Sequence, residues 1–405
     1  MKILLVHNFY GSAAPSGENA AYEAERDLLK SHGHTVTEFT RHSDDIRKKG
    51  FAGEIAGALS TPWNPFSYRR LKAIVKREPP DVMHVHNFFP LISPSVFYAI
   101  QNTKTAAVFT LHNYRIFCAA AIPMREDKIC TECFDTHSVC PAMKHGCYRD
   151  SRAATLPMVA MIALHRNLGT WTRRVDGFIA LTEFQRHMLA QAGLPVEKIY
   201  VKPHFYPDAP GPVPWAEREN KVVYIGRLGR EKGVEVLLKA WKLLGGAAPH
   251  LEIIGDGPEK ERLIASLDLS SENRITFTGQ LPFAEAQKRL AGASALILPS
   301  LCFEGFPMVI REAFALGVPV MASRIGAIPE IVMDGKNGVL FEAGNAGEMQ
   351  SIVVQAFKNR DKLQFMSINA RQDFEHKYTA EKNLEALINI YQKAIAHKRG
   401  KSASA

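Results

Sequence analysis

The sequence predicts an α/β protein with two doubly wound, Rossmann-like domains of parallel sheet, which we expect to face each other across a cleft. Short apolar runs rich in Val and Ile alternate with helical patterns along the chain, as they do where crossover helices join parallel strands. The length of 405 residues accommodates two ordinary domains. A polar stretch with four prolines, residues 205–220, separates two series of apolar runs and is the expected linker.

The apolar runs are expected to form six strands on either side of the linker. In the first half they are residues 2–7, 35–40, 81–86, 106–112, 177–182 and 198–203. In the second half they are residues 221–226, 251–255, 274–279, 294–300, 318–323 and 338–341. Ligands of such sheets usually lie beyond the carboxyl ends of the strands, so site residues are expected there.

The predicted domains are an N-terminal domain at residues 1–204 and a C-terminal domain at residues 221–378. A last helix is expected at residues 379–397, where we predict that it packs back toward the N-terminal domain. Residues 398–405 are expected to be a tail.

The formal net charge of +9 favours an anionic ligand or surface. Nucleic acid is one candidate by charge alone, and we expect no nucleic-acid partner. The apolar run at the N-terminus is too short for a signal peptide, and no run approaches the roughly twenty residues of a membrane-spanning helix. The expected compartment is the cytoplasm.

The stretch GRLGREKG, which follows the expected strand 221–226, indicates a diphosphate site. Gly226 allows close backbone approach, and Arg227 and Lys232 supply cations. Gly233 precedes a helix whose first N–H groups carry partial positive charge. Either basic residue alone is typical of a solvated loop, but their position beside glycines at a strand end favours phosphate binding.

The stretch FEGFPMVIRE places two glutamates around the start of a helix. Glu304 lies in the loop, Pro307 suits the first helical position, and Glu312 falls inside the helix. The N–H groups at that helix start, around Phe306 to Val309, are expected to be free for a ligand. One glutamate alone is typical of a cap or a surface helix, whereas the whole stretch indicates a ligand with hydroxyls and a phosphate.

Three motifs in order resemble those of retaining glycosyltransferases of the GT-B fold, family 4, also called glycosyl transferases group 1. They are GRLGREKG, E-G-F-P-x-x-x-x-E from Glu304 to Glu312, and GAIPEIVMDGKNGVLF at residues 326–341. The resemblance implies transfer of a hexose-type sugar from a nucleoside diphosphate sugar to a saccharide or lipid-linked saccharide. It also implies that no metal ion or other cofactor is required.

The resemblance implies that the N-terminal domain is on the acceptor side and that the C-terminal domain binds the nucleotide sugar. It also assigns roles to residues by position. Arg227 and Lys232 would bind the diphosphate, Glu312 the ribose hydroxyls, and Glu304 the donor sugar. His112 resembles the family histidine that lies over the transferred sugar. The residues implied in catalysis are therefore His112, Glu304, Arg227 and Lys232. The residues implied in donor binding are Gly226, Arg227, Lys232, Glu304, Gly305, Phe306, Pro307, Met308, Val309 and Glu312. The residues implied in an acceptor or phosphate loop are Ser16, Gly17 and Glu18.

The implied reaction is front-face substitution rather than hydrolysis by a pair of carboxylates. Glu312, near the ribose, is not placed on the reacting carbon, so it is not expected to act as a nucleophile. Leaving-group charge would be stabilised by Arg227, Lys232 and helix N–H groups. Alternatives are a nucleotide-sugar 2-epimerase of the same architecture and a nucleotide-sugar-binding protein without activity. The order of EGFPMVIRE and GAIPEIV favours the transferase, and the presence of all implied catalytic residues argues against lost activity.

A segment rich in cysteine, residues 118–152, interrupts the alternation of strands and helices. Thiols that pack an insertion are the favoured interpretation, with no metal site. The alternative is structural zinc on Cys130, Cys133, Cys140 and Cys147, although the second pair lacks close spacing.

Positive charge gathers in the first half, with nine Lys or Arg against three acids in residues 41–77. Residues 156–174 are apolar with basic flanks. They fit either an anionic membrane surface or a core helix with solvated ends, and both alternatives stay open. The membrane alternative predicts a peripheral protein on the inner face of the plasma membrane and a lipid-linked acceptor in cell-surface polysaccharide synthesis. His84 and His86, at another strand end, are expected to be structural.

Overall fold

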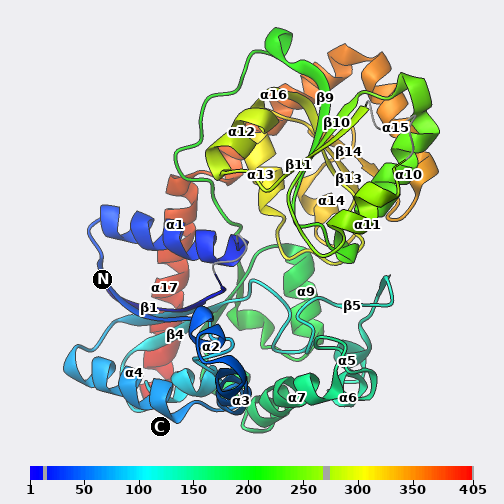
Figure 1. Ribbon diagram of the computed structural model, residues 1–405. Coiled ribbons are helices and arrows are strands. Elements are labelled where there is room, and N and C mark those ends of the chain that lie inside the picture. Colours follow the sequence, from blue (N-terminus) through cyan, green and yellow to red (C-terminus); the bar gives the residue numbers. More distant parts are fainter. Residues whose placement is uncertain (12–15, 268–273, 404–405) are drawn as a thin grey trace. The chain divides into compact units, whose positions relative to one another are not determined.

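The structure, a computed structural model, describes residues 1–11, 16–267 and 274–403, and its chain forms two compact units (Figure 1). Unit 1 contains Met1–Pro123, Thr131–His204 and the segment from Asn383 onward. Unit 2 contains Met124–Cys130 and Phe205–Lys382, so the predicted linker clusters with unit 2.

The sheet of unit 1 has six parallel strands within the described residues, in the order β2-β1-β3-β4-β7-β8. They are β1 (Lys2–Phe9), β2 (Thr35–His42), β3 (Val82–Asn87), β4 (Ala106–Thr110), β7 (Gly177–Ala180) and β8 (Ile199–Val201). The central strands β3 and β4 are buried along their whole length, as in a parallel sheet covered on both faces.

Unit 1 also contains helices. They are α1 (Gly17–Ser31), α2 (Asp44–Arg47), α3 (Gly50–Ser60), α4 (Pro65–Arg77), α5 (Glu132–Asp135), α6 (Cys140–His145), α7 (Arg152–Asn167), α8 (Thr170–Arg173), α9 (Glu183–Gln191) and most of α17 (Ala380–Ala403). Leu387, Ile390 and Tyr391 of α17 share a core with Ile3 and Leu5 of β1, so the C-terminal helix packs on the sheet of unit 1 (Figure 1, red). The helix continues past residue 397, where the predicted helix ends.

The sheet of unit 2 also has six parallel strands in the described part of the chain, in the order β11-β10-β9-β12-β13-β14. They are β9 (Glu219–Ile225), β10 (His250–Ile254), β11 (Ile275–Gly279), β12 (Ala293–Leu298), β13 (Val320–Ser323) and β14 (Gly338–Phe341). In chain order this is 3-2-1-4-5-6, the strand order of dinucleotide-binding doubly wound sheets.

The helices of unit 2 are α10 (Val234–Leu244), α11 (Lys260–Ala265), α12 (Phe283–Ala291), α13 (Met308–Ala315), α14 (Ile328–Ile331), α15 (Ala346–Lys358) and α16 (Arg360–Lys377). Leu237 and Trp241 of α10 pack with Met349 and Val353 of α15 in one core beneath the sheet. Burial of these large apolar side chains is the main stabilising contribution at this face.

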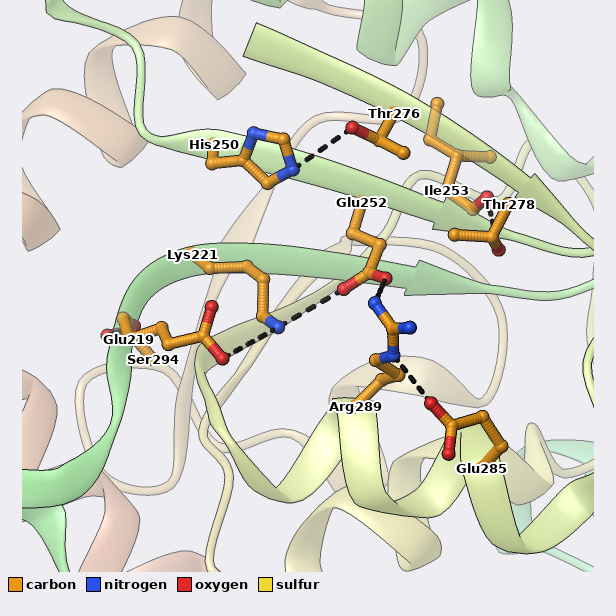
Figure 2. A network of polar contacts seen from close by, with 10 residues as sticks. All are labelled: Glu219, Lys221, His250, Glu252, Ile253, Thr276, Thr278, Glu285, Arg289 and Ser294. Atoms are coloured by element: carbon orange, nitrogen blue, oxygen red, sulfur yellow. Dashed lines mark hydrogen bonds and ion pairs between the residues drawn. The ribbon is translucent and has the colours of Figure 1, made fainter.

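A polar network fixes α12 to the opposite face of the sheet (Figure 2). Glu252, buried in β10, lies 3.2 Å from Lys221 Nζ and accepts a hydrogen bond of 2.8 Å from Arg289 Nη1 of α12. Arg289 also donates to Glu285, and Lys221 also pairs with Glu219. Because the buried carboxylate of Glu252 has two cationic partners, its burial is compensated.

The prediction of two doubly wound α/β halves is confirmed, and each predicted strand has a counterpart. A short hairpin of β5 (Met124–Arg125) and β6 (Lys128–Ile129) was not predicted. Its turn residues Glu126 and Asp127 both have positive φ, as in a type I′ turn. The usual sequence signal for that turn is Asn-Gly or Asp-Gly, which Glu-Asp does not provide.

Candidate functional site

The strongest candidate site in unit 2 lies at the carboxyl ends of β9 and β12. These strands are neighbours in the sheet but not in sequence, so the connections that follow them separate at this point. Such a switch point is where open α/β sheets place their ligands. Both predicted motifs lie here, because Gly226–Lys232 follows β9 and Ser300–Glu304 follows β12.

Glycines bring the backbones at this end of the sheet into close contact. A Cβ on Gly233 would lie 2.0 Å from the carbonyl oxygen of Pro299, and one on Gly255 would lie 1.9 Å from that of Gly226. Gly233 also has a φ of +68°, which favours glycine. The N–H of Leu301 donates to the carbonyl of Glu231 at 2.9 Å, so the loops after β9 and β12 are joined directly.

Lys232 and Glu304 meet in these joined loops. Lys232 Nζ donates a hydrogen bond of 2.6 Å to Glu304 Oε1, and the hydroxyl of Ser300 donates to the same oxygen at 2.8 Å. Burial alone lowers the pKa of the lysine, but the Glu304 carboxylate outweighs it and raises the pKa above its ordinary value. The ammonium group therefore stays charged at neutral pH. It has three N–H donors, and the bond to Glu304 uses one of them.

Arg227 presents the second predicted cation of the site. Its Nη2 lies 2.6 Å from Glu231 Oε1, and its carbonyl accepts a hydrogen bond from the buried Tyr224 hydroxyl. The Arg227 side chain is 59% exposed, whereas that of Lys232 is 24% exposed. Lys232 is therefore held in a drier environment, where a charge interaction is stronger.

Two helices begin at this end of the sheet, and among the described residues neither start has a side-chain cap. α10 follows Gly233 and α13 follows Pro307. First-turn N–H groups without such a cap are donors for an anion. The predicted donor residues Gly305, Met308 and Val309 are half-buried around the start of α13, and Phe306 and Pro307 are buried.

Glu312, one turn into α13, is buried and has partners different from those of Glu304. Gln287 Nε2 donates to Glu312 Oε2 at 3.0 Å, and Arg311 Nη2 lies 3.9 Å from the other oxygen. Burial raises the pKa of Glu312, while Arg311 and the bond from Gln287 oppose the rise. The structure thus brings Lys232, Ser300 and Glu304 together and gives Glu312 a separate set of contacts.

Unit 1 carries a cluster of histidines at the ends of its central strands. His86 Nδ1 lies 3.2 Å from His112 Nε2, and the rings of His112 and His204 stack with centroids 5.1 Å apart. His7 lies near the carboxyl end of β1, the neighbour of β3 at the switch point of this sheet. Burial holds the pKa of His112 well below its ordinary value, and the neighbouring His204 and His86 lower it further. The predicted sugar-side histidine is therefore a neutral imidazole.

A buried ion pair that the sequence analysis did not identify supports this cluster. Lys202 Nζ donates to Glu25 Oε2 at 2.6 Å, and Glu25 Oε1 lies 3.2 Å from His84 Nδ1 and 3.1 Å from His86 Nε2. The hydroxyl of Tyr391, from α17, lies 2.8 Å from His84 Nδ1. One sequence signal was available, because Glu25 falls on the buried face of α1, where a carboxylate requires a partner.

The predicted acceptor or phosphate loop lies at the start of α1. Ser16 is the N-cap and accepts a hydrogen bond from the N–H of Asn19, and Gly17 is the first helical residue. Glu18 Oε1 accepts a bond of 2.7 Å from Asn113 Nδ2, one position after His112. Burial raises the pKa of Glu18.

A metal-compatible group among the described residues is Glu25, His84 and His86, whose ligand atoms lie within 4.8 Å of one another. Lys202 already supplies the cation for that carboxylate, so the arrangement is that of an ion pair. Within the described residues, the thiols suggested for zinc are not among the groups whose ligand atoms lie this close together.

Comparison with known families identifies both halves of the chain. The sequence profile of Glycosyl transferases group 1 matches residues 207–373, and that of Glycosyltransferase Family 4 matches residues 18–208. Together these matches run from residue 18 to residue 373 without a gap. The chain belongs to the family 4 glycosyltransferases.

Relatives of this family 4 glycosyltransferase match it over different lengths. The uncharacterized glycosyltransferase MJ1178 of Methanocaldococcus jannaschii is 28% identical over 43% of this chain, and the match spans about half, 48%, of that protein. The putative teichuronic acid biosynthesis glycosyltransferase TuaC of Bacillus subtilis is 22% identical over 97% of this chain and 98% of its own length.

Solved structures support the GT-B fold of the chain. Alr3699/HepE of Anabaena in complex with UDP has a TM-score of 0.66 and 18% identity, covering 97% of this chain and all of that chain. The same protein has also been solved with UDP-glucose. Within the described residues of this glycosyltransferase, no helix is both long enough and apolar enough to span a membrane.

Proposed function

We propose that this glycosyltransferase takes its sugar from a nucleoside diphosphate sugar and that Lys232 is the principal cation for the diphosphate. The observation that carries the proposal is the Lys232–Glu304 pair at the switch point between β9 and β12, where glycines let the loops pack directly against each other. The UDP and UDP-glucose complexes of the structural neighbour are consistent with this kind of donor.

The proposed chemistry is stabilisation of the departing diphosphate. Negative charge grows on the leaving oxygen as the bond to the sugar breaks, so preorganised donors around it lower the barrier. Lys232 supplies a charged donor, Arg227 a second one at the more exposed edge, and the starts of α10 and α13 supply N–H groups. No metal ion or cofactor is needed in this scheme.

Retention of configuration is the proposed stereochemical outcome, by front-face substitution. Glu304 is occupied by Lys232 and Ser300, and Glu312 by Gln287, so each carboxylate has a structural or binding task other than nucleophilic attack. We assign Glu304 to the donor sugar, Glu312 to the ribose and His112 to the transferred sugar. Burial keeps His112 neutral, which allows a hydrogen bond to a sugar hydroxyl without adding charge.

The proposed acceptor is a saccharide or lipid-linked saccharide, and the transferred unit is a hexose. The name of TuaC places that relative in teichuronic acid synthesis, which favours a role in cell-surface polysaccharide synthesis for this chain. We place that role in the cytoplasm.

The proposal is tested by turnover of nucleoside diphosphate sugars with purified protein and simple saccharide acceptors. Lys232→Ala is expected to reduce kcat/KM by about 10²–10³-fold and Arg227→Ala by less, because Lys232 is more buried. Lys239→Ala, an exposed lysine of α10, is the matched control and should retain full activity. Near-normal turnover of both site variants would remove the diphosphate assignment.

The same assay decides the remaining points. NMR of the product should show the anomeric configuration of the donor, and activity should persist in a chelator. A nucleotide-sugar 2-epimerase would instead consume the donor without an acceptor and give the 2-epimer. Binding of donors without any turnover would indicate a non-catalytic protein.

A further inference from the structure

Helix α3 packs against its own unit through glycines and leaves its large apolar side chains outside. Gly53 and Gly57 are the buried residues of α3. A Cβ on Gly53 would lie 2.2 Å from the carbonyl oxygen of Ile46, and one on Gly57 would lie 3.0 Å from the Ile46 side chain. The glycine face therefore lies directly on the α2 segment.

The opposite face of α3 is apolar and exposed. Phe51, Ile55 and Leu59 follow one another at a spacing of four residues, so they form one stripe. By helical periodicity the centre of this stripe lies about half a turn from Gly53 and Gly57. The stripe residues are 77%, 46% and 74% exposed. Phe66, in the first turn of α4, is 72% exposed.

Basic residues flank this apolar stripe on both sides in sequence. Arg47, Lys48 and Lys49 are exposed immediately before α3. Arg69, Arg70, Lys72, Lys76 and Arg77 are exposed along α4. Residues 41–77 contain nine Lys or Arg and three acids, one of which, Glu54, lies on α3 itself. Figure 1 shows α2, α3 and α4 in shades of blue along one end of unit 1.

We propose that α3 and the start of α4 bind the surface of an anionic lipid bilayer, with the apolar stripe in the headgroup region and the flanking cations on the lipid phosphates. An eleven-residue helix is too short to span a bilayer, but one with an exposed apolar face can lie in the interface when cations flank it. Phe and Leu side chains are suited to the boundary between headgroups and acyl chains, and the neighbouring Lys and Arg side chains are suited to anionic headgroups.

The surface is different from the membrane segment considered from the sequence. Within residues 156–174, Met158, Met161, Ile162 and His165 are buried, so α7 fits the alternative of a core helix with solvated ends. The sequence pattern was ambiguous because an apolar helix with basic ends fits both settings. The exposed large apolar side chains of that segment are Leu156, at its start, and Leu168, just after α7, whereas those of α3 form one stripe.

A lipid surface fits these residues better than a protein partner does. Lysine is depleted at the cores of protein interfaces, whereas each Lys or Arg near an anionic bilayer strengthens binding. Binding to lipid does not require turnover, so this inference stands or falls independently of the proposed reaction.

The test is flotation of the full-length protein with vesicles of phosphatidylcholine alone or with phosphatidylglycerol. The wild type should float with the anionic vesicles and not with the neutral ones. Phe51→Ser/Leu59→Ser should weaken binding at least tenfold. Lys48→Glu/Lys49→Glu should weaken it roughly fivefold or more per lysine. Salt at about 1 M should release the wild type from the vesicles, because it screens the attraction between the basic side chains and the lipid phosphates.

Matched controls separate this surface from general effects. Phe365→Ser/Ile368→Ser removes two exposed apolar side chains of α16 in unit 2. Lys358→Glu/Lys362→Glu makes the same charge change at the end of α15 and the start of α16. Both should bind like the wild type, and circular dichroism should show that all variants are folded. Absence of wild-type binding, or unchanged binding of folded Phe51→Ser/Leu59→Ser, overturns the proposal. So does a wild-type dimer in light scattering that this variant loses, because the stripe would then bind a second copy.

Discussion

The two units use the same type of sheet but build their charged clusters in different ways. In unit 2, Lys232 and Glu304 each lie in a short motif directly after a strand, and glycines fix the loops against each other. In unit 1, Glu25, Lys202 and His84 come from distant parts of the chain, and Tyr391 reaches His84 across 307 positions. A site made of local motifs can be read from sequence, whereas a dispersed cluster becomes visible only in the fold.

This comparison suggests that the cluster of unit 1 supports stability and that of unit 2 serves the ligand. The Lys202–Glu25 pair is almost completely buried, and Lys202 Nζ also donates a hydrogen bond to Asn383 Oδ1 of α17. The cations of unit 2 are more exposed and lie at the carboxyl ends of strands, where ligands bind. The following predictions test that division, beginning with the largest effect.

Lys202→Met should destabilise unit 1 by about 3–5 kcal/mol, because it leaves the buried carboxylate of Glu25 without its cation. Calorimetric unfolding of the full chain measures the change. Lys104→Met, at an exposed lysine of the same unit, is the control and should change little. The double variant Glu25→Leu/Lys202→Met should recover part of the loss. A Lys202→Met protein as stable as the control would mean that the pair is not structural.

Gly233→Ala should cost about 3 kcal/mol or more, since the positive φ disfavours alanine and the new Cβ would meet the carbonyl of Pro299. Gly335→Ala is the matched control, because Gly335 has a φ of +74° and no atom within 4 Å of the added Cβ. It should cost only about 1 kcal/mol. Urea unfolding of both variants measures the difference, and equal costs would contradict the close backbone contact.

Acidification should destabilise unit 1 more than unit 2. Burial lowers the pKa of His84 to about 4, and burial with the neighbouring His86 holds His7 at about 3. In the unfolded chain these groups titrate near about 6.5, so below that pH the unfolded state binds protons that the folded state does not. Stability should therefore fall between about pH 6.5 and 4, by up to about 1.4 kcal/mol per pH unit for each histidine.

Unit 2 provides the internal control for this pH dependence. Its histidines, His250 and His376, are both exposed. The change from pH 7 to pH 5 should therefore lower the unfolding temperature of unit 1 more than that of unit 2, as measured by calorimetry. Equal shifts of both transitions would show that the buried histidines are not the cause.

Much of this molecule was predictable because its signals are local. Val- and Ile-rich runs identified the strands, and GRLGREKG with FEGFPMVIRE identified the loops at the switch point of unit 2. The Lys202–Glu25 pair was not predictable, because nothing within either local stretch names a partner 177 positions away. Which face of α3 is buried was not predictable either. Its buried contacts are made by glycines, which carry no apolar signal, while its apolar residues face outward.

The most direct test of the division between the units is calorimetric titration of UDP, GDP and ADP into the wild type, Lys232→Met and Lys239→Met. We predict that at least one nucleoside diphosphate binds the wild type and Lys239→Met equally. Its affinity for Lys232→Met should be roughly 10–100-fold lower, since a charged hydrogen bond contributes about 1.5–3 kcal/mol. Unchanged affinity of Lys232→Met would contradict the diphosphate site.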